Sequence, residues 1–188
     1  MFERNKNILE KILKFENMIS DNKSIFLDFD DVEDIILYYL NEDNFEYAKK
    51  AIDFGINLYP TNLNIIILKS ELLLSINKKN EAEKLVSKFI ISHEGNIDLL
   101  FQKAKILTSR KNYKESIKLL SKLAYNNELE FYINDLLFKN YMNVEDYPNA
   151  IKIGNNIITK NPENNFFFDK LLSCYKLSKK RNEAEEFL

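Results

Sequence analysis

The sequence has few of the residues from which catalytic and metal-binding sites are usually built. Its 188 residues include one cysteine, one histidine, three glycines, three prolines and no tryptophan. A single cysteine excludes an internal disulfide, and with one histidine it cannot complete a His/Cys metal site. Gly55, Gly95 and Gly154 are too far apart to form a phosphate-binding loop. We therefore expect no metal, no cofactor and no enzymatic activity.

Long apolar runs are also missing. Runs such as 65–68 and 72–74 fall far short of the ~18 residues that suggest a membrane-spanning helix. Residues 1–15 interleave charged and apolar side chains, unlike a secretory signal. With 27 basic and 29 acidic residues, the formal net charge of −2 argues against a nucleic-acid-binding surface. A cytoplasmic location is the expectation, and Cys174 fits a reducing compartment.

What remains is a helical pattern. Hydrophobic residues make up 45% of the chain and charged residues 30%, enough for one domain with a continuous core and a charged exterior. Scarce glycine and proline, with apolar residues at helical spacing, predict an all-α protein. We expect helices over 3–20, 30–41, 44–58, 63–76, 79–92, 97–109, 112–125, 131–143, 146–160, 165–178 and from 181 onward.

Some local features follow from the same pattern. Residues 24–29 are expected to form an extended lead-in that packs on the first helix pair. The turn residues Asp43, Asn44, Asn112 and Asp146 can cap the helices that follow them. Gly55 and Gly154 lie inside predicted helices, where close approach of another backbone would explain their cost of about 1 kcal/mol each.

The most informative feature is a period of 34 residues, with units beginning at residues 29, 63, 97, 131 and 165. Position 20 of each unit holds Ala48, Ala82, Ser116, Ala150 and Ala184. Position 11 holds Tyr39, Leu73, Leu107, Tyr141 and Tyr175, and position 17 includes Phe45, Tyr113 and Tyr147. Self-similarity at this period predicts paired helices stacked into a solenoid.

These positions resemble the tetratricopeptide repeat, whose motif has a small residue at position 8, glycine at 15, alanine at 20 and proline at 32. Position 32 holds Pro60 and Pro162. Position 8 departs from the motif at Ile36, Phe138 and Leu172, which leaves open how closely the first, fourth and fifth helix pairs approach. Position 15 departs everywhere, at Asp43, Asn77, Lys111, Glu145 and Lys179.

The resemblance implies an α-α superhelix of about five helix hairpins with an N-terminal capping helix. Its predicted divisions are an N-terminal helix and lead-in at 1–28, then a repeat array over 29–188. The repeats are 29–62, 63–96, 97–130, 131–164 and an incomplete 165–188. The incomplete repeat predicts exposed apolar surface at that end, with two explanations left open: a truncated gene, or a second copy that covers the surface in a homo-oligomer.

The family also implies a non-enzymatic scaffold whose concave groove, lined by the first helices, binds a protein or peptide partner. The groove positions predicted to bind it are Asp30, Glu33, Asp34, Ile67, Leu68, Phe101, Tyr132, Asp135 and Lys139. The alternative for Ile67, Leu68 and Phe101 is simple packing between helices. The lysine and asparagine at positions 5 and 9 that clamp chaperone tails in some members are Glu33 and Leu37 here, so that function is not carried over.

A second function class stays open beside the scaffold. The array would then be a structural or regulatory segment of a larger multi-repeat or multi-domain assembly, packing on further repeats or on another domain.

Overall fold

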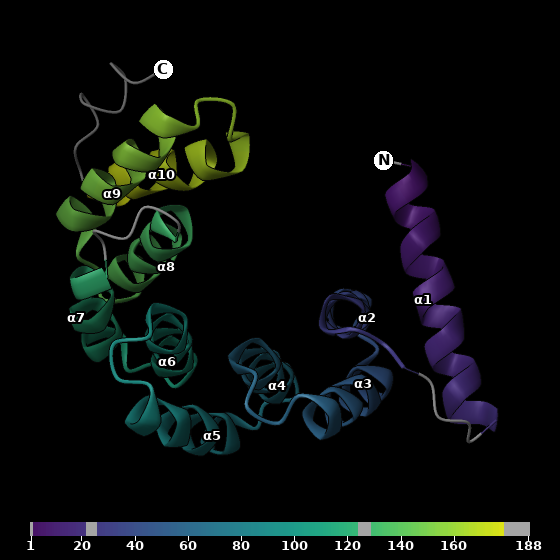
Figure 1. The fold of residues 1–188 in the computed structure, drawn as a ribbon. Coiled ribbons are helices and arrows are strands. Elements are labelled where there is room, and N and C mark those ends of the chain that lie inside the picture. Colours follow the sequence, from purple (N-terminus) through teal and green to yellow (C-terminus); the bar gives the residue numbers. More distant parts are fainter. Residues whose placement is uncertain (1, 22–25, 124–128, 179–188) are drawn as a thin grey trace. The chain divides into compact units, whose positions relative to one another are not determined.

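The computed structural model describes residues 2–21, 26–123 and 129–178, apart from the side chains of 2–7, 165 and 166. In these ranges the chain forms helices and no strand (Figure 1). The helices are α1 (Phe2–Asp21), α2 (Phe29–Asn41), α3 (Phe45–Leu58), α4 (Leu63–Ser75), α5 (Lys79–Ser92), α6 (Ile97–Ser109), α7 (Tyr113–Leu123), α8 (Glu130–Asn143), α9 (Tyr147–Lys160) and α10 (Asn165–Leu177). The all-α prediction is confirmed. The helix expected from 181 onward lies outside the described residues.

The chain divides into two compact units, Met1–Phe89 and Ile90–Leu188, and the division falls within α5. In the first unit α1 contacts α2, and α2, α3 and α4 contact one another. In the second unit each helix from α6 to α10 contacts the next one, and α6 also contacts α8. Contacts between successive helices are those of stacked hairpins. The division of 29–188 into 34-residue repeats stays a prediction.

The turn inside four hairpins has one backbone conformation. In each, the residue at position 15 has a positive φ: 53° at Asp43, 61° at Asn77, 65° at Lys111 and 60° at Glu145. In the first turn, the N–H of Asn44 donates to Tyr39 O at 2.9 Å and that of Asp43 to Leu40 O at 3.3 Å. This pair of bonds is a Schellman motif, which favours glycine at the left-handed residue. The departures at position 15 therefore keep the geometry and change only the residue that adopts it.

Side-chain caps begin most of the described helices. Asn44 Oδ1 accepts from Tyr47 N at 3.3 Å and Asp146 Oδ1 accepts from Asn149 N at 3.3 Å, as predicted. Asp43 has a different role from the one predicted, because it is the left-handed residue that precedes the cap. Asn62, Asn96 and Asn164 cap α4, α6 and α10 in the same way.

The small residues at position 20 are fully buried. Ala48, Ala82, Ser116 and Ala150 are all 0% exposed; Ala184 lies outside the described residues. The two helical glycines allow close packing, but the groups that approach them are side chains of other helices and not another backbone, which was the expectation from the sequence. A Cβ at Gly55 would lie 2.8 Å from Val32 Cγ1, and one at Gly154 would lie 2.6 Å from Leu171 Cδ1 and 3.2 Å from Phe138 Cε2.

Gly154 also explains how the fourth helix pair packs closely although position 8 holds the bulky Phe138. Phe138 is 2% exposed, and its ring lies 4.9 Å from that of Phe167, measured between centroids. The space that a small residue at position 8 would leave is provided here by a glycine on the facing helix. In this contact the large residue, Phe138, is on α8 and the small one, Gly154, is on α9, and the two helices still pack closely.

Helix α1 covers the first hairpin as the predicted capping helix. Phe15 is 1% exposed, with its ring 6.2 Å from Tyr39 and 5.9 Å from Phe54. Tyr39 Oη donates to Glu16 Oε1 at 2.9 Å. In the lead-in, Leu27 is buried and its carbonyl accepts from Tyr59 Oη at 3.0 Å. Residues 24 and 25 of the predicted lead-in lie outside the described residues.

Candidate partner-binding faces

The predicted binding residues are on the first helices of the hairpins. We call the α2 and α4 surface the unit 1 face, and the α6, α8 and α10 surface the unit 2 face. Asp30, Glu33, Asp34, Ile67 and Leu68 belong to the unit 1 face. Phe101, Tyr132, Asp135 and Lys139 belong to the unit 2 face. Each face is described separately.

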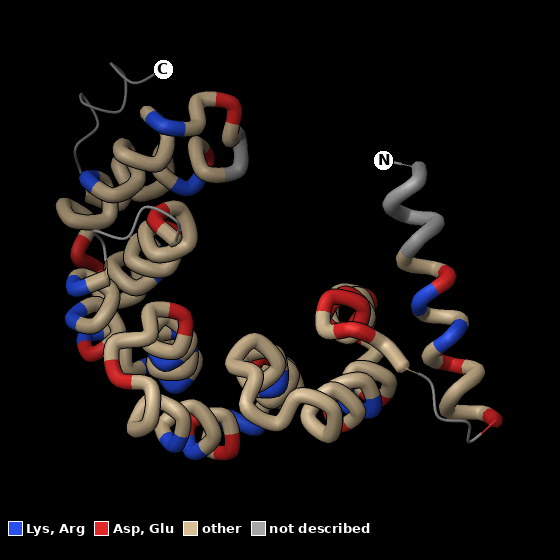
Figure 2. The backbone as a smooth tube through the Cα atoms, in the orientation of Figure 1, with Lys and Arg blue, Asp and Glu red and all other residues tan. Residues whose placement is uncertain are grey.

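The unit 1 face carries a group of carboxylates at the start of α2 (Figure 2). Asp30 and Asp34 are exposed and Glu33 is half-buried. Burial raises the pKa of Glu33, the negative charges of Asp30 and Asp34 add to that rise, and a hydrogen bond from Asn64 opposes it. That bond joins Asn64 Nδ2 to Glu33 Oε1 at 3.2 Å and links α4 to α2. The repulsion among these carboxylates would be relieved by a cation.

The protein supplies one such cation itself. Lys11 of α1 reaches across to α2, with its Nζ 2.6 Å from Asp31 Oδ1 and 2.7 Å from Asp34 Oδ2. These hydrogen bonds raise the pKa of Lys11 to about 12. Asp34, predicted as a partner contact, is therefore already paired within the chain, while Asp30 and Glu33 stay available on this face.

The apolar predicted residues of α4 are less accessible than the acidic ones of α2. Leu68 is 6% exposed and belongs to the core of the first unit. Ile67, one residue earlier, is half-buried. Leu68 thus packs between helices and supports the face, whereas Ile67 still presents part of its side chain.

On the unit 2 face, Tyr132 is the most exposed of the predicted residues, at 59%. Its ring lies 5.7 Å from that of Phe131, which is 41% exposed, in an edge-to-face arrangement at 79°. Phe101 of α6 is half-buried and packs against the cluster that contains Ala104 and Leu137. Tyr132 is therefore an open aromatic contact, and Phe101 is a partly covered one.

Three charged side chains belong to the same face, Asp135 and Lys139 on α8 and Lys170 on α10. Lys139 Nζ pairs with Asp135 Oδ2 at 2.5 Å, one helical turn away. Lys170 of α10 is half-buried, and this burial lowers its pKa; Asp135 opposes the shift and Lys139 adds to it. Tyr132, Asp135 and Lys139 are spaced at i, i+3 and i+7, so they share one side of α8.

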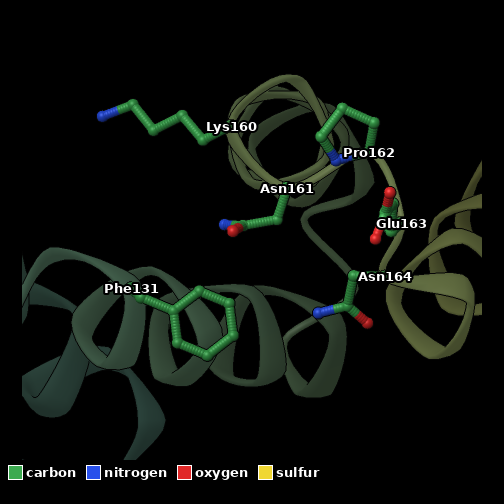
Figure 3. Close-up of a pocket in the computed structure, with 6 residues that line it drawn as sticks. All are labelled: Phe131, Lys160, Asn161, Pro162, Glu163 and Asn164. Atoms are coloured by element: carbon green, nitrogen blue, oxygen red, sulfur yellow. The ribbon is translucent and has the colours of Figure 1, made fainter.

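A pocket of about 690 Å³ lies beside the first turn of α8 and was not anticipated from the sequence. Figure 3 shows the Phe131 ring on one side and Lys160, Asn161 and the following turn on the other. Pro162, Glu163 and Asn164 complete the lining. Lys160 pairs with Glu130, which lowers the pKa of that carboxyl. Phe131 occupies position 1, where Phe29, Leu63 and Ile97 stand in earlier repeats, so its sequence pattern indicated only packing.

The described residues offer little that could carry out a reaction. No group of three or more His, Cys, Asp or Glu side chains among them is arranged to hold a metal ion. Cys174 is buried, and burial raises the pKa of its thiol to about 11, which disfavours the nucleophilic thiolate. No helix in the part of the chain that the structure describes is long and apolar enough to cross a membrane.

Comparison with solved structures identifies the fold. No protein-family model and no curated protein matches the sequence. PilF of Pseudomonas aeruginosa is 14% identical, with a TM-score of 0.72 over 84% of this chain and 72% of that one. A tetratricopeptide repeat protein from Parabacteroides merdae is 12% identical, with a TM-score of 0.70 over 98% and 72%. A double mutant of MamA RS-1 is 15% identical, with a TM-score of 0.66 over 82% and 87%. These likenesses show that the chain has the tetratricopeptide-repeat fold, an all-α superhelix of helix hairpins.

Proposed function

We propose that this chain is a non-enzymatic scaffold that binds a segment of a partner protein on the first helices of its hairpins. The observation that carries the proposal is Tyr132, a large aromatic side chain left 59% exposed on the unit 2 face. Exposed tyrosine with charged neighbours is typical of protein-binding surfaces, where aromatic anchors contribute most of the affinity. Asp135 and Lys139, on the same side of α8, supply those neighbours, and Lys170 of α10 interacts electrostatically with both.

The unit 1 face fits the same proposal with a different chemistry. Asp30 and Glu33 favour basic side chains of a partner, and Ile67 offers an apolar contact beside them. Charge complementarity of this kind favours one partner orientation over the reverse. We propose a cytoplasmic protein or peptide as the partner, and no nucleic acid.

Photo-crosslinking in cells tests the proposal by capturing the protein that contacts this face. A photoreactive amino acid replaces Tyr132 in one variant. In a matched control it replaces Lys118, which is exposed on α7, the second helix of its hairpin. Position 132 should yield a defined protein adduct that position 118 does not. Equal adducts from both positions, or none from 132, would contradict binding on this face.

Once the partner is identified, its affinity tests the anchors. The double variant Phe101→Ala with Tyr132→Ala should weaken binding by about tenfold or more, since truncation of an aromatic anchor costs ~2 kcal/mol at such sites. Circular dichroism should show unchanged helicity. Undiminished affinity would favour the other function class, a structural segment of a larger assembly.

A further inference from the structure

The outer side of α1 carries two exposed leucines with no packing role in the first unit. Leu9 is 53% exposed and Leu13 is 57% exposed. They are spaced at i and i+4, which places them one above the other on the helix surface. Glu10 and Lys14, also exposed and also at i and i+4, lie along one flank of this leucine pair. Figure 2 shows both acidic and basic residues along this helix.

The rest of α1 is firmly attached, so the leucine pair is held on a fixed platform. Ile12 and Phe15 are buried at 5% and 1% exposure. Lys11 is paired with Asp31 and Asp34, and Glu16 accepts from Tyr39. Rotating α1 to bury Leu9 and Leu13 would break all of these contacts. With α1 held in place, the two leucines present their exposed side chains for contact with another molecule.

The pattern on α1 is complementary to itself in one orientation. When two copies of α1 run antiparallel about a two-fold axis at residue 11, Leu9 of each faces Leu13 of the other. In that arrangement Glu10 lies within about 3 Å, measured along the axis, of Lys14 of the second copy, because a helix rises 1.5 Å per residue. The symmetry produces two such ion pairs and two leucine pairs. A parallel pairing would bring neither charge opposite the other.

We propose that the chain associates with a second copy of itself through antiparallel contact of the α1 helices, with Leu9 and Leu13 at the centre and Glu10–Lys14 ion pairs at the edge. This surface is on the capping helix and shares no residue with the proposed partner faces, so the inference does not depend on the proposed function. The area is small, and the association is correspondingly weak and concentration-dependent.

Sedimentation equilibrium of the full chain over a range of concentrations tests the dimer. The double variant Leu9→Glu with Leu13→Glu should weaken dimerisation by at least about tenfold, since it places like charges where apolar side chains met. The matched control is Ile91→Glu on α5, where the isoleucine is 78% exposed, and it should leave the dimer unchanged. A strictly monomeric parent, or a dimer indifferent to the leucine substitutions, overturns the proposal.

A charge-reversal cycle tests the antiparallel orientation. Glu10→Lys and Lys14→Glu should each weaken the dimer about fivefold or more at low salt, because each creates two like-charged contacts. The double reversal should restore the parent affinity to within about twofold, since the opposite charges then meet again. Circular dichroism of each variant reports whether α1 stays helical. Failure of the double reversal to restore dimerisation rules out this pairing.

Discussion

The side-chain amide of Asn140 donates a hydrogen bond of 2.9 Å to Ser116 Oγ, and both residues are 0% exposed. Ser116 stands where alanine occupies the other described repeats, and Asn140 stands where Leu72 and Ile106 occur. Thr108 Oγ1 donates to Asn140 Oδ1 at 3.0 Å, and Ser116 Oγ donates to Ala104 O at 3.0 Å. Two polar substitutions in neighbouring repeats thus compensate each other inside the apolar core.

This compensation predicts a strong coupling between the two sites. Ser116→Ala should destabilise by about 1–3 kcal/mol, because it removes the acceptor of a buried amide. The double variant Ser116→Ala with Asn140→Leu restores the apolar pair of the other repeats and should cost less than the sum of the single variants. Urea unfolding of the four proteins measures the coupling. Additive effects would show that the hydrogen bond contributes nothing of its own.

The left-handed turns predict an easy gain in stability. Lys111 has a φ of 65°, a conformation that costs a non-glycine residue about 1–2 kcal/mol. Glycine avoids this steric cost, but it loses more backbone entropy on folding, which offsets about 0.5–1 kcal/mol of the gain. Lys111→Gly should therefore stabilise by about 0.5–1 kcal/mol, and Glu145→Gly should act similarly.

The control for this prediction is Lys118→Gly, exposed in the middle of α7. It should destabilise by about 1 kcal/mol, since glycine is unfavourable inside a helix. Thermal unfolding monitored by circular dichroism distinguishes the two directions. If Lys111→Gly is as destabilising as Lys118→Gly, the turn conformation assigned to position 15 is wrong.

The sequence predicted the fold well because the features that determine it are local and repeated. Apolar residues at helical spacing placed every described helix to within a few residues, and the small residues at position 20 of the 34-residue period were buried as their pattern suggested. The division into two compact units at Phe89 and Ile90 could not be foreseen, because the period runs through that point without interruption.

The candidate faces were less predictable, because exposure depends on contacts that the repeat pattern does not encode. Leu68 and Ile67 are neighbours of the same apolar type, yet Leu68 is in the core and Ile67 is half-exposed. The pairing of Asp34 with Lys11 joins residues 23 apart, from a helix that is out of phase with the repeats. A single sequence gives no signal for either outcome.

The small residues at position 20 are buried, so we expect a larger side chain there to overpack the helix hairpin. Ala150 is 0% exposed in a cluster with Phe138 and Leu171, so Ala150→Leu should destabilise by about 1–3 kcal/mol. Ala82→Leu, at an equally buried position, should do the same. Lys152→Leu and Lys84→Leu provide exposed controls on the same helices and should change stability by less than about 0.5 kcal/mol. Thermal unfolding that matches the parent in the alanine variants would contradict the assigned register.

We expect the thiol of Cys174 to react only when the second unit unfolds. With a pKa of about 11, roughly one thiol in a thousand is ionised at pH 8, and the side chain is 0% exposed. Labelling with a disulfide reagent at pH 8 should be slow in the native protein and become fast in denaturant. The variant Cys174→Ala with Ser173→Cys moves the thiol to an exposed neighbour and should react rapidly in the native fold. Equal rates for the two native proteins would show that Cys174 is accessible.

Because Lys11 holds α1 to α2 through its charge, we expect the attachment of α1 to the first hairpin to weaken at alkaline pH. Its pKa rises from the ordinary value of 10.5 to about 12 on folding, because the ammonium donates to Asp31 and Asp34. A raised folded-state pKa stabilises the protein fully below pH 10.5, and this stabilisation is lost as the pH rises through about 12. Lys11→Met should therefore be less stable than the parent at pH 7, and the difference should shrink above pH 10.5.

Lys49→Met is the matched control for this pH dependence, since Lys49 is exposed on α3 of the same unit and makes neither ion pair with α2. Urea unfolding at pH 7, 10 and 11.5 compares the three proteins while cancelling the titration of the other lysines and tyrosines, which all three share. The parent and Lys49→Met should lose stability in parallel, and Lys11→Met should approach them as the pH rises. A difference between the parent and Lys11→Met that stays constant up to pH 11.5 would mean that Lys11 acts through its aliphatic chain, and that its charge contributes nothing to holding α1 on the first hairpin.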